Sequence, residues 1–177
     1  MRLEQLEHLI RAAAVIANDD ELIIIGSQAI LGSYPQAPDE LLVSAEADLY
    51  PRNYPQRADL IDGSIGELSP FHDEFGYYAQ GVAPDTALLP SGWEQRLIAI
   101  RTPGTRGATG WCLHPHDLAL SKLAAGRDKD LRFVADMAKH AMFDPRALED
   151  LVSQMNLPSD FAELVRARVR TAAGSVK

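Results

Sequence analysis

The chain has 177 residues, of which 46% are hydrophobic and 24% are charged, and its formal net charge is -8. This length and composition fit a globular protein with a well-formed hydrophobic core and exclude a generally disordered chain. The acidic balance argues against a protein that coats DNA or RNA, because a negative surface repels the phosphate backbone.

Cys112 is the only cysteine, which excludes an intrachain disulfide and a zinc site built from cysteines. No run approaches the ~20 apolar residues that a membrane-spanning helix requires, and the acidic N-terminal segment does not resemble a signal peptide. We therefore expect a cytoplasmic protein that does not associate with a membrane.

The first quarter of the chain predicts a helix followed by a buried strand. Apolar residues recur at helical spacing over about residues 2–17, and residues 22–25 form a short apolar run that is rich in β-branched side chains. Such a run is typical of a strand that is buried on both faces. Gly26 and Ser27 end this strand, and a short helix over 28–31 is expected before a proline-containing loop.

Residues 41–50 predict a strand that carries two carboxylates on one face. Period-two alternation places Glu46 and Asp48 on one side, whereas the core face would hold Leu41, Val43, Ala45, Ala47 and Leu49. The two acidic side chains then lie about 7 Å apart along the strand, and both can reach one cation. The same alternation is also typical of a strand with one solvated face, so the pair alone does not establish a site.

The remaining pattern predicts an α/β protein of the α+β type. Further strands are expected over residues 77–82, 97–101 and 110–113, with a helix over 57–68 and a Gly-rich turn over 103–109. His72 falls in a segment interpreted as a polar loop. Helices are expected from about residue 116 to 125, over 128–142, from 145 and from 159. We therefore expect a mixed sheet with packed helices over residues 1–113 and a C-terminal helical region over 114–177 that packs on it.

The order of these features suits nucleotidyl transfer. A divalent cation such as Mg²⁺ prefers carboxylate oxygens, which Glu46 and Asp48 supply. The Gly26-Ser27 turn offers backbone N–H groups and a hydroxyl to a phosphate, and glycine allows a close approach. Transfer of this kind depends mainly on positioning and on neutralising the charge of the triphosphate.

Two segments resemble the nucleotidyltransferase superfamily, which has the DNA polymerase β-like fold. Residues 24–30 (IIGSQAI) match its Gly-Ser motif, and residues 44–50 (SAEADLY) match its acidic-x-Asp strand. Within the superfamily, the chain is similar to small bacterial proteins related to abortive-infection nucleotidyltransferase toxins. Residues 116–130 (HDLALSKLAAGRDKD) resemble the helical segment that carries a lysine near the triphosphate in many of them. The resemblance covers about residues 20–140.

The resemblance implies an enzyme that moves a nucleoside monophosphate from an NTP to an acceptor hydroxyl. Glu46 and Asp48 would be catalytic residues that bind Mg²⁺ or Mn²⁺, although the superfamily usually has Asp at the position of Glu46. A third carboxylate normally comes from a later strand. Asp85, just after the predicted strand over 77–82, is the candidate, and it would activate the acceptor.

The resemblance also implies that the nucleotide is bound by Gly26, Ser27, Lys122 and Arg127. Each polar side chain has an ordinary structural alternative. Ser27 could be a helix N-cap, Lys122 a surface lysine and Arg127 part of a solvated helix face. Asp130 could equally hold Lys122 or Arg127 in place.

The expected partners are an NTP and an acceptor, which is RNA, a protein or a small molecule. The toxin relatives add a cognate antitoxin as a candidate partner. A second copy of the chain is a further candidate, and bulk DNA binding is not expected. Two alternatives stay open. Without a third carboxylate the chain would be a catalytically degenerate binding or regulatory module, and the motif could also arise by chance in an unrelated α/β domain.

Overall fold

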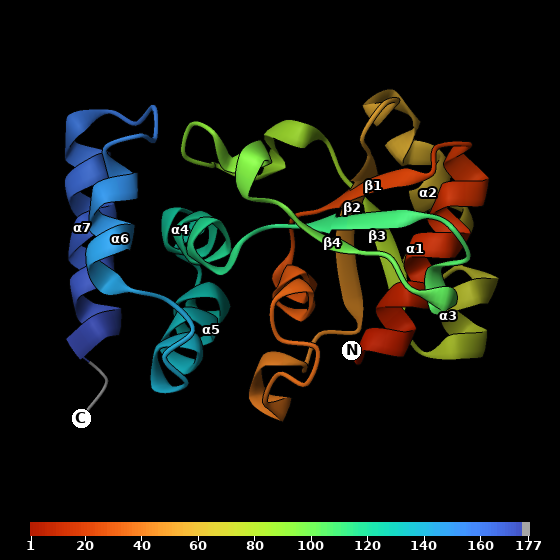
Figure 1. Ribbon diagram of the computed structural model, residues 1–177, viewed down its shortest axis with the longest axis horizontal. Helices are drawn as coiled ribbons and strands as arrows, with labels where there is room; N and C mark the ends of the chain where they lie inside the picture. Colours follow the sequence, from red (N-terminus) through yellow and green to blue (C-terminus); the bar gives the residue numbers. More distant parts are fainter. Residues whose placement is uncertain (175–177) are drawn as a thin grey trace.

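Figure 1 shows the computed structural model, in which residues 1–174 are described. Five strands form one mixed sheet in the order β3-β2-β1-β5-β4. They are β1 (Glu21–Ile24), β2 (Glu46–Pro51), β3 (Tyr78–Gly81), β4 (Ile98–Ile100) and β5 (Thr109–Cys112). The β1·β5 and β2·β3 pairs are parallel, whereas the β1·β2 and β4·β5 pairs are antiparallel. The architecture confirms the predicted α+β fold.

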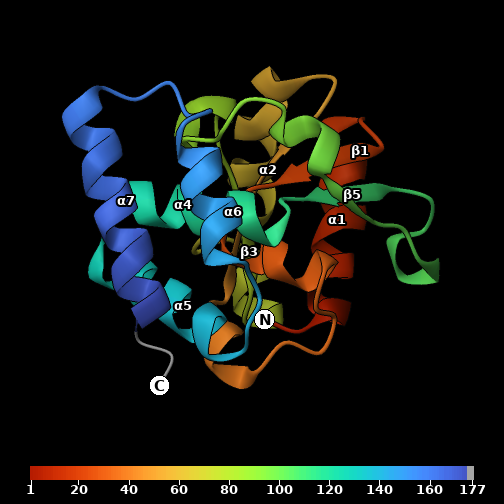
Figure 2. The same cartoon turned by 60° about the vertical axis from the view of Figure 1, so that its left-hand side comes forward.

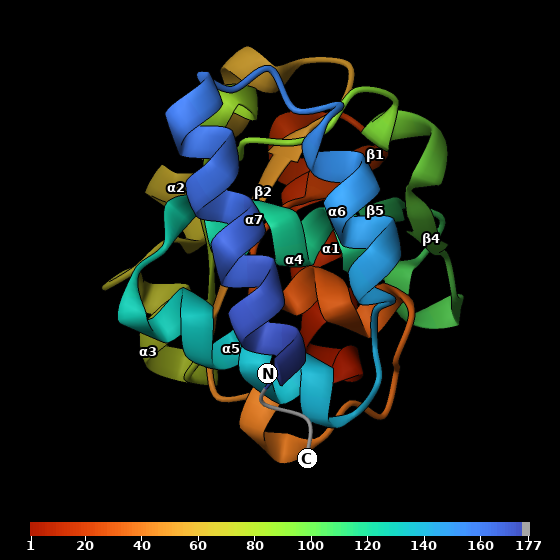
Figure 3. The same ribbon diagram turned by 90° about the vertical axis from the view of Figure 1, so that its left-hand side faces the viewer.

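The helices lie in two groups on opposite sides of the sheet (Figure 1). The first group is α1 (Leu3–Ala17), α2 (Ala58–Ile65) and α3 (Pro70–Phe75). The second group follows the last strand and consists of α4 (Pro115–Ala125), α5 (Asp128–Lys139), α6 (Pro145–Val152) and α7 (Ser159–Gly174). Here α6 and α7 pack on the outside of α4 and α5 (Figures 2 and 3). Among residues 1–174, no helix has the length and apolar character that a membrane crossing needs.

One buried apolar cluster connects the sheet with both groups of helices. It runs from Leu6 in α1 through Ile24 in β1 and Leu118 in α4 to Val169 in α7, and these four side chains are completely buried. All five strands precede residue 113, close to the expected boundary between the sheet region and the C-terminal helices. The cluster crosses this boundary, so the two regions share one core.

The prediction of a strand over residues 41–50 is wrong for the first half of this segment. Asp39–Leu41 is a 3-10 turn, and the strand begins only at Glu46. The carbonyl groups of this segment are used elsewhere: the Ser44 carbonyl accepts hydrogen bonds from the N-terminal amine at 2.9 Å and from the Gln28 amide at 3.2 Å. Val43, expected in the core, is 82% exposed. The alternation of apolar and polar residues therefore begins before Glu46, where pairing in the sheet begins.

The prediction of a polar loop around His72 is also wrong, because these residues form helix α3. Ser69 is its N-cap and accepts a hydrogen bond from the His72 backbone N–H at 3.2 Å, and Pro70 occupies the first helical position. The helix places the His72 ring against Tyr78 in β3, with ring centroids 4.5 Å apart. The Ser-Pro start signal is visible in the sequence, but the helix is too short to show apolar periodicity.

Candidate active site

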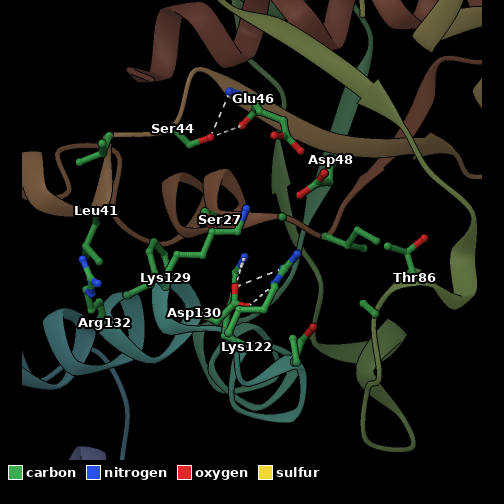
Figure 4. A pocket seen from close by; sticks show the side chains of 18 of the residues that line it. Ser27, Leu41, Ser44, Glu46, Asp48, Thr86, Lys122, Lys129, Asp130 and Arg132 are labelled. Carbon is green, nitrogen blue, oxygen red and sulfur yellow. Dashed lines mark hydrogen bonds and ion pairs between the residues drawn. The ribbon is translucent and has the colours of Figure 1, made fainter. Parts of the chain in front are cut away.

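A cavity of about 740 Å³ lies between the sheet and helices α4 and α5 (Figure 4). Its volume is within the range that is typical of small-molecule sites. Six of the seven site residues predicted from the sequence line it together: Gly26, Ser27, Glu46, Asp48, Lys122 and Arg127. Asp85 is the exception. The motif residues that follow β1, those of β2 and α4, and the N-cap of α5 therefore meet in one hollow.

Glu46 and Asp48 form an acidic pair on the cavity face of β2. The residues between and after them, Ala47 and Leu49, are completely buried on the opposite face. Burial, followed by the hydrogen bond and the negative charge of Glu46, raises the pKa of Asp48 to about 7, although Lys122 and Lys129 act in the opposite direction. The two carboxylates therefore repel each other, and a cation between them would relieve this repulsion.

Gly26 is required by the space that Asp48 occupies. A Cβ atom at residue 26 would lie 2.1 Å from Oδ2 of Asp48. The backbone of Gly26 is extended (φ -81°, ψ -172°), a conformation that any residue adopts, so the restriction is on side-chain volume. Gly26 is also the N-cap of the 3-10 helix Ser27–Gly32. Ser27 therefore does not fill the capping role, and it lies on the cavity wall (Figure 4).

Lys122 and Arg127 are held by one buried carboxylate. The Lys122 Nζ atom lies 3.3 Å from Oδ1 of Asp130, and Arg127 Nε lies 2.6 Å from Oδ2. Although burial raises it, the pKa of Asp130 is lowered overall because Arg127 and Lys122 stabilise the charged form. The Lys122 side chain is only 12% exposed, which excludes an ordinary surface lysine. One carboxylate faces two cations, so this cluster keeps a net positive charge beside the cavity.

The structure does not bring Asp85 to the acidic pair. Asp85 is exposed in the 3-10 turn Pro84–Thr86, where its neighbour Thr86 lines the cavity. The parallel register of β2 and β3 instead pairs Asp48 with Gln80, a neutral amide that also lines the cavity. Over residues 1–174, no group of three acidic, histidine or cysteine side chains is arranged to hold a metal ion. The site therefore offers the carboxylate pair of Glu46 and Asp48, because the other acidic residues that line the cavity, Glu40, Asp130 and Asp136, are each engaged in an ion pair.

Tyr78 is a further residue of this region that sequence reasoning missed. It pairs with Glu46 across β2 and β3, and its hydroxyl donates a hydrogen bond to Oε2 of Glu46 at 3.2 Å. Burial, followed by the charge of Glu46, raises the pKa of Tyr78 to about 12, so the phenol stays protonated and remains a donor. Only the register between the two strands reveals this pair.

Comparison with known families agrees with this geometry. A family model described as "Nucleotidyltransferase of unknown function (DUF6036)" matches residues 1–170, which include the sheet, the whole cavity and most of α7. No curated protein and no solved structure matches the chain. The match agrees with the resemblance of the Gly-Ser and acidic-x-Asp segments to the nucleotidyltransferase superfamily. The chain therefore belongs to the nucleotidyltransferase family DUF6036, whose function is not known.

Proposed function

We propose that this protein is a metal-dependent transferase that moves a nucleoside monophosphate from an NTP to an acceptor hydroxyl. The observation that carries this proposal is the cavity in which the Glu46 and Asp48 carboxylates face Ser27 and the cations of α4 and α5. Two carboxylates are sufficient for Mg²⁺, which keeps several waters and is usually held by one or two carboxylates together with substrate phosphates. Bound there, the metal would neutralise charge on the triphosphate.

The cationic side of the cavity supports a role in holding the phosphates. Asp130 fixes Lys122 and Arg127 before any ligand arrives, so little side-chain entropy is lost when they bind an anion. Ser27 adds a hydroxyl donor on the same wall. In the transfer, the acceptor oxygen bonds to the α-phosphorus, the bond to the β-phosphate oxygen breaks, pyrophosphate leaves, and the hydroxyl proton passes to water.

The acceptor and the biological setting belong to the same proposal. The resemblance to abortive-infection toxins supports RNA or a protein as the acceptor over a small molecule, and a cognate antitoxin as a partner. Gln80, beside Asp48, can accept a hydrogen bond from the attacking hydroxyl but cannot remove its proton. The metal and the positioning of the substrates would therefore have to supply most of the rate enhancement.

The test combines ligand binding with turnover. Melting temperatures are measured with ATP, CTP, GTP and UTP, each with and without Mg²⁺, and pyrophosphate release is followed in parallel. An NTP at 100 times its Kd should stabilise the fold by about 2.7 kcal/mol. Asp48→Ala should remove the metal-dependent shift and lower turnover far more than tenfold. Asp150→Asn, an exposed residue of α6, is the matched control. Unaltered transfer by Asp48→Ala would contradict the mechanism.

Gln80 favours a second candidate function, a binding or regulatory module that has lost catalysis. In this case a neutral amide stands beside Asp48, where a third carboxylate would serve as the base. An NTP-dependent shift in melting temperature without pyrophosphate release would support this alternative.

A further inference from the structure

We infer that Tyr78 is a positioning residue that fixes the Glu46 carboxylate for metal binding, and that the neighbouring His72 ring supports Tyr78. The inference rests on the proposed function, because it takes Glu46 as a metal ligand. It adds Tyr78 from β3 and His72 from α3 to the site residues predicted from the sequence motifs.

Strand register brings Tyr78 to Glu46. The two residues are direct partners in the parallel β2·β3 pair, and the Tyr78 hydroxyl donates to Oε2 of Glu46 at 3.2 Å. Glu46 lines the cavity, whereas Tyr78 is not among the residues that form its wall. The hydrogen bond occupies one of about four lone-pair positions of the carboxylate, so the others stay available to a cation. Tyr78 therefore contacts Glu46 from outside the cavity wall.

The two acidic residues need different support. Asp48 is largely enclosed, and the absence of a side chain at Gly26 leaves room for its carboxylate. Glu46 has one more methylene group, and therefore one more torsion angle to fix. Partners that hydrogen-bond a metal ligand orient it and tune its affinity. Tyr78 supplies to Glu46 the restraint that Asp48 obtains from packing.

The His72 ring packs beside Tyr78 and has a hydrogen-bond partner of its own. The rings lie 4.5 Å apart at an angle of 45°. The His72 Nδ1 atom accepts a hydrogen bond from the Leu68 backbone N–H at 3.1 Å. Leu68 has a φ of 60°, in the left-handed region that a non-glycine residue seldom adopts, and its side chain is 83% exposed. The left-handed backbone of Leu68 thus directs its N–H group at His72, while the Leu68 side chain stays exposed to solvent.

The test compares Tyr78→Phe with Tyr77→Phe by Mn²⁺ titration calorimetry of the full chain. We expect Tyr78→Phe to bind Mn²⁺ about tenfold more weakly, the lower end of the effect of removing such a partner. The melting temperature of the metal-free protein should stay unchanged, which separates positioning from a structural role. Tyr77 is the matched control, because its hydroxyl bonds His8 Nδ1 at 2.7 Å instead of Glu46. Tyr77→Phe should keep the wild-type affinity.

A double-mutant cycle sharpens the test. In a Glu46→Asp background the shorter side chain cannot reach Tyr78, so Tyr78→Phe should cause no further loss of affinity. Equal Mn²⁺ affinity of the wild type and Tyr78→Phe, or an undiminished effect in the Glu46→Asp background, would overturn the inference alone. Equal Mn²⁺ binding by the wild type and Asp48→Ala would overturn the metal site and the inference together.

Discussion

At the scale of single residues, the Asp48 side chain is constrained both sterically and electrostatically. Its carboxylate is largely enclosed, lies against the backbone of Gly26 and shares a hydrogen bond with Glu46. In the metal-free protein these contacts favour the neutral form, whereas cation binding requires the charged form. Two measurements on single variants can separate the steric constraint from the electrostatic one.

Gly26→Ala tests the steric constraint. The added Cβ would lie 2.1 Å from Oδ2 of Asp48, so we expect a loss of about 1–3 kcal/mol in the free energy of unfolding. The loss should shrink in an Asp48→Ala background, which vacates the space. Gly63→Ala in α2 is the control: no atom lies within 4 Å of the added Cβ, and a gain of about 0.5–1 kcal/mol is expected. Urea denaturation measures both, and an unchanged stability of Gly26→Ala would refute the steric argument.

Asp48→Asn tests the electrostatic constraint. The pKa of Asp48 is raised from 3.8 to about 7 on folding, so between these values the folded protein keeps a proton that the unfolded chain has lost. Stability should therefore fall as the pH rises from about 4 to about 7 and change little above that. At about 1.4 kcal/mol per pKa unit, the total decrease in the free energy of unfolding is a few kcal/mol at most.

Denaturation with a chelator present, at pH 5 and pH 8, measures this effect. Asp48→Asn should lack the decrease seen in the wild type, whereas Asp150→Asn should keep it. Parallel pH profiles for the wild type and Asp48→Asn would show that Asp48 does not carry the shift.

At the scale of elements, the sequence allowed the motif-bearing parts to be predicted and left their neighbours undetermined. The predictions of β1 and the helix of Lys122 are confirmed, because local apolar patterns define them. The start of β2 was placed too early, since alternation does not reveal where sheet pairing stops. Gln80 and Tyr78 could not be assigned, because their positions follow from the pairing of β3 with β2, which no local pattern encodes.

Helix α4, which carries Lys122, is fixed by an ion pair that the sequence does not reveal. Asp117 is completely buried, and Arg96 binds it through Nε at 2.9 Å and through a terminal nitrogen at 2.7 Å. Arg96→Ala would leave a buried carboxylate without its partner, at an expected cost of about 3–5 kcal/mol in unfolding free energy. Replacing both residues by alanine should recover part of this loss.

The matched control is the exposed pair of Arg170 and Glu149, whose closest atoms are 3.9 Å apart. Arg170→Ala should cost less than about 1 kcal/mol. Similar losses for Arg96→Ala and Arg170→Ala in chemical denaturation would contradict the role assigned to burial.

At the scale of the whole molecule, the cavity and the core both depend on contacts between the two halves of the chain. The acidic pair and Ser27 come from the strand region, whereas Lys122 and Arg127 come from the helices that follow it. The buried residues form one cluster in space, whose members extend along the sequence from Met1 to Ala172. Neither half therefore forms the site or completes the core alone.

We accordingly expect a single cooperative unfolding transition. Both tryptophans, Trp93 and Trp111, precede residue 113, so their fluorescence reports on the strand region. Far-UV circular dichroism is dominated by helices, of which α4 to α7 follow residue 114. The two signals should give the same midpoint temperature. Two separate midpoints would show that the halves unfold as independent units.

The position of Gln80 has an evolutionary consequence. Glutamine and glutamate codons differ by one base, and Gln80 already lies beside Asp48 on the cavity wall. A single nucleotide change in this chain would therefore place a further carboxylate beside Asp48. The two-carboxylate pair of this protein is thus one mutational step from a group of three.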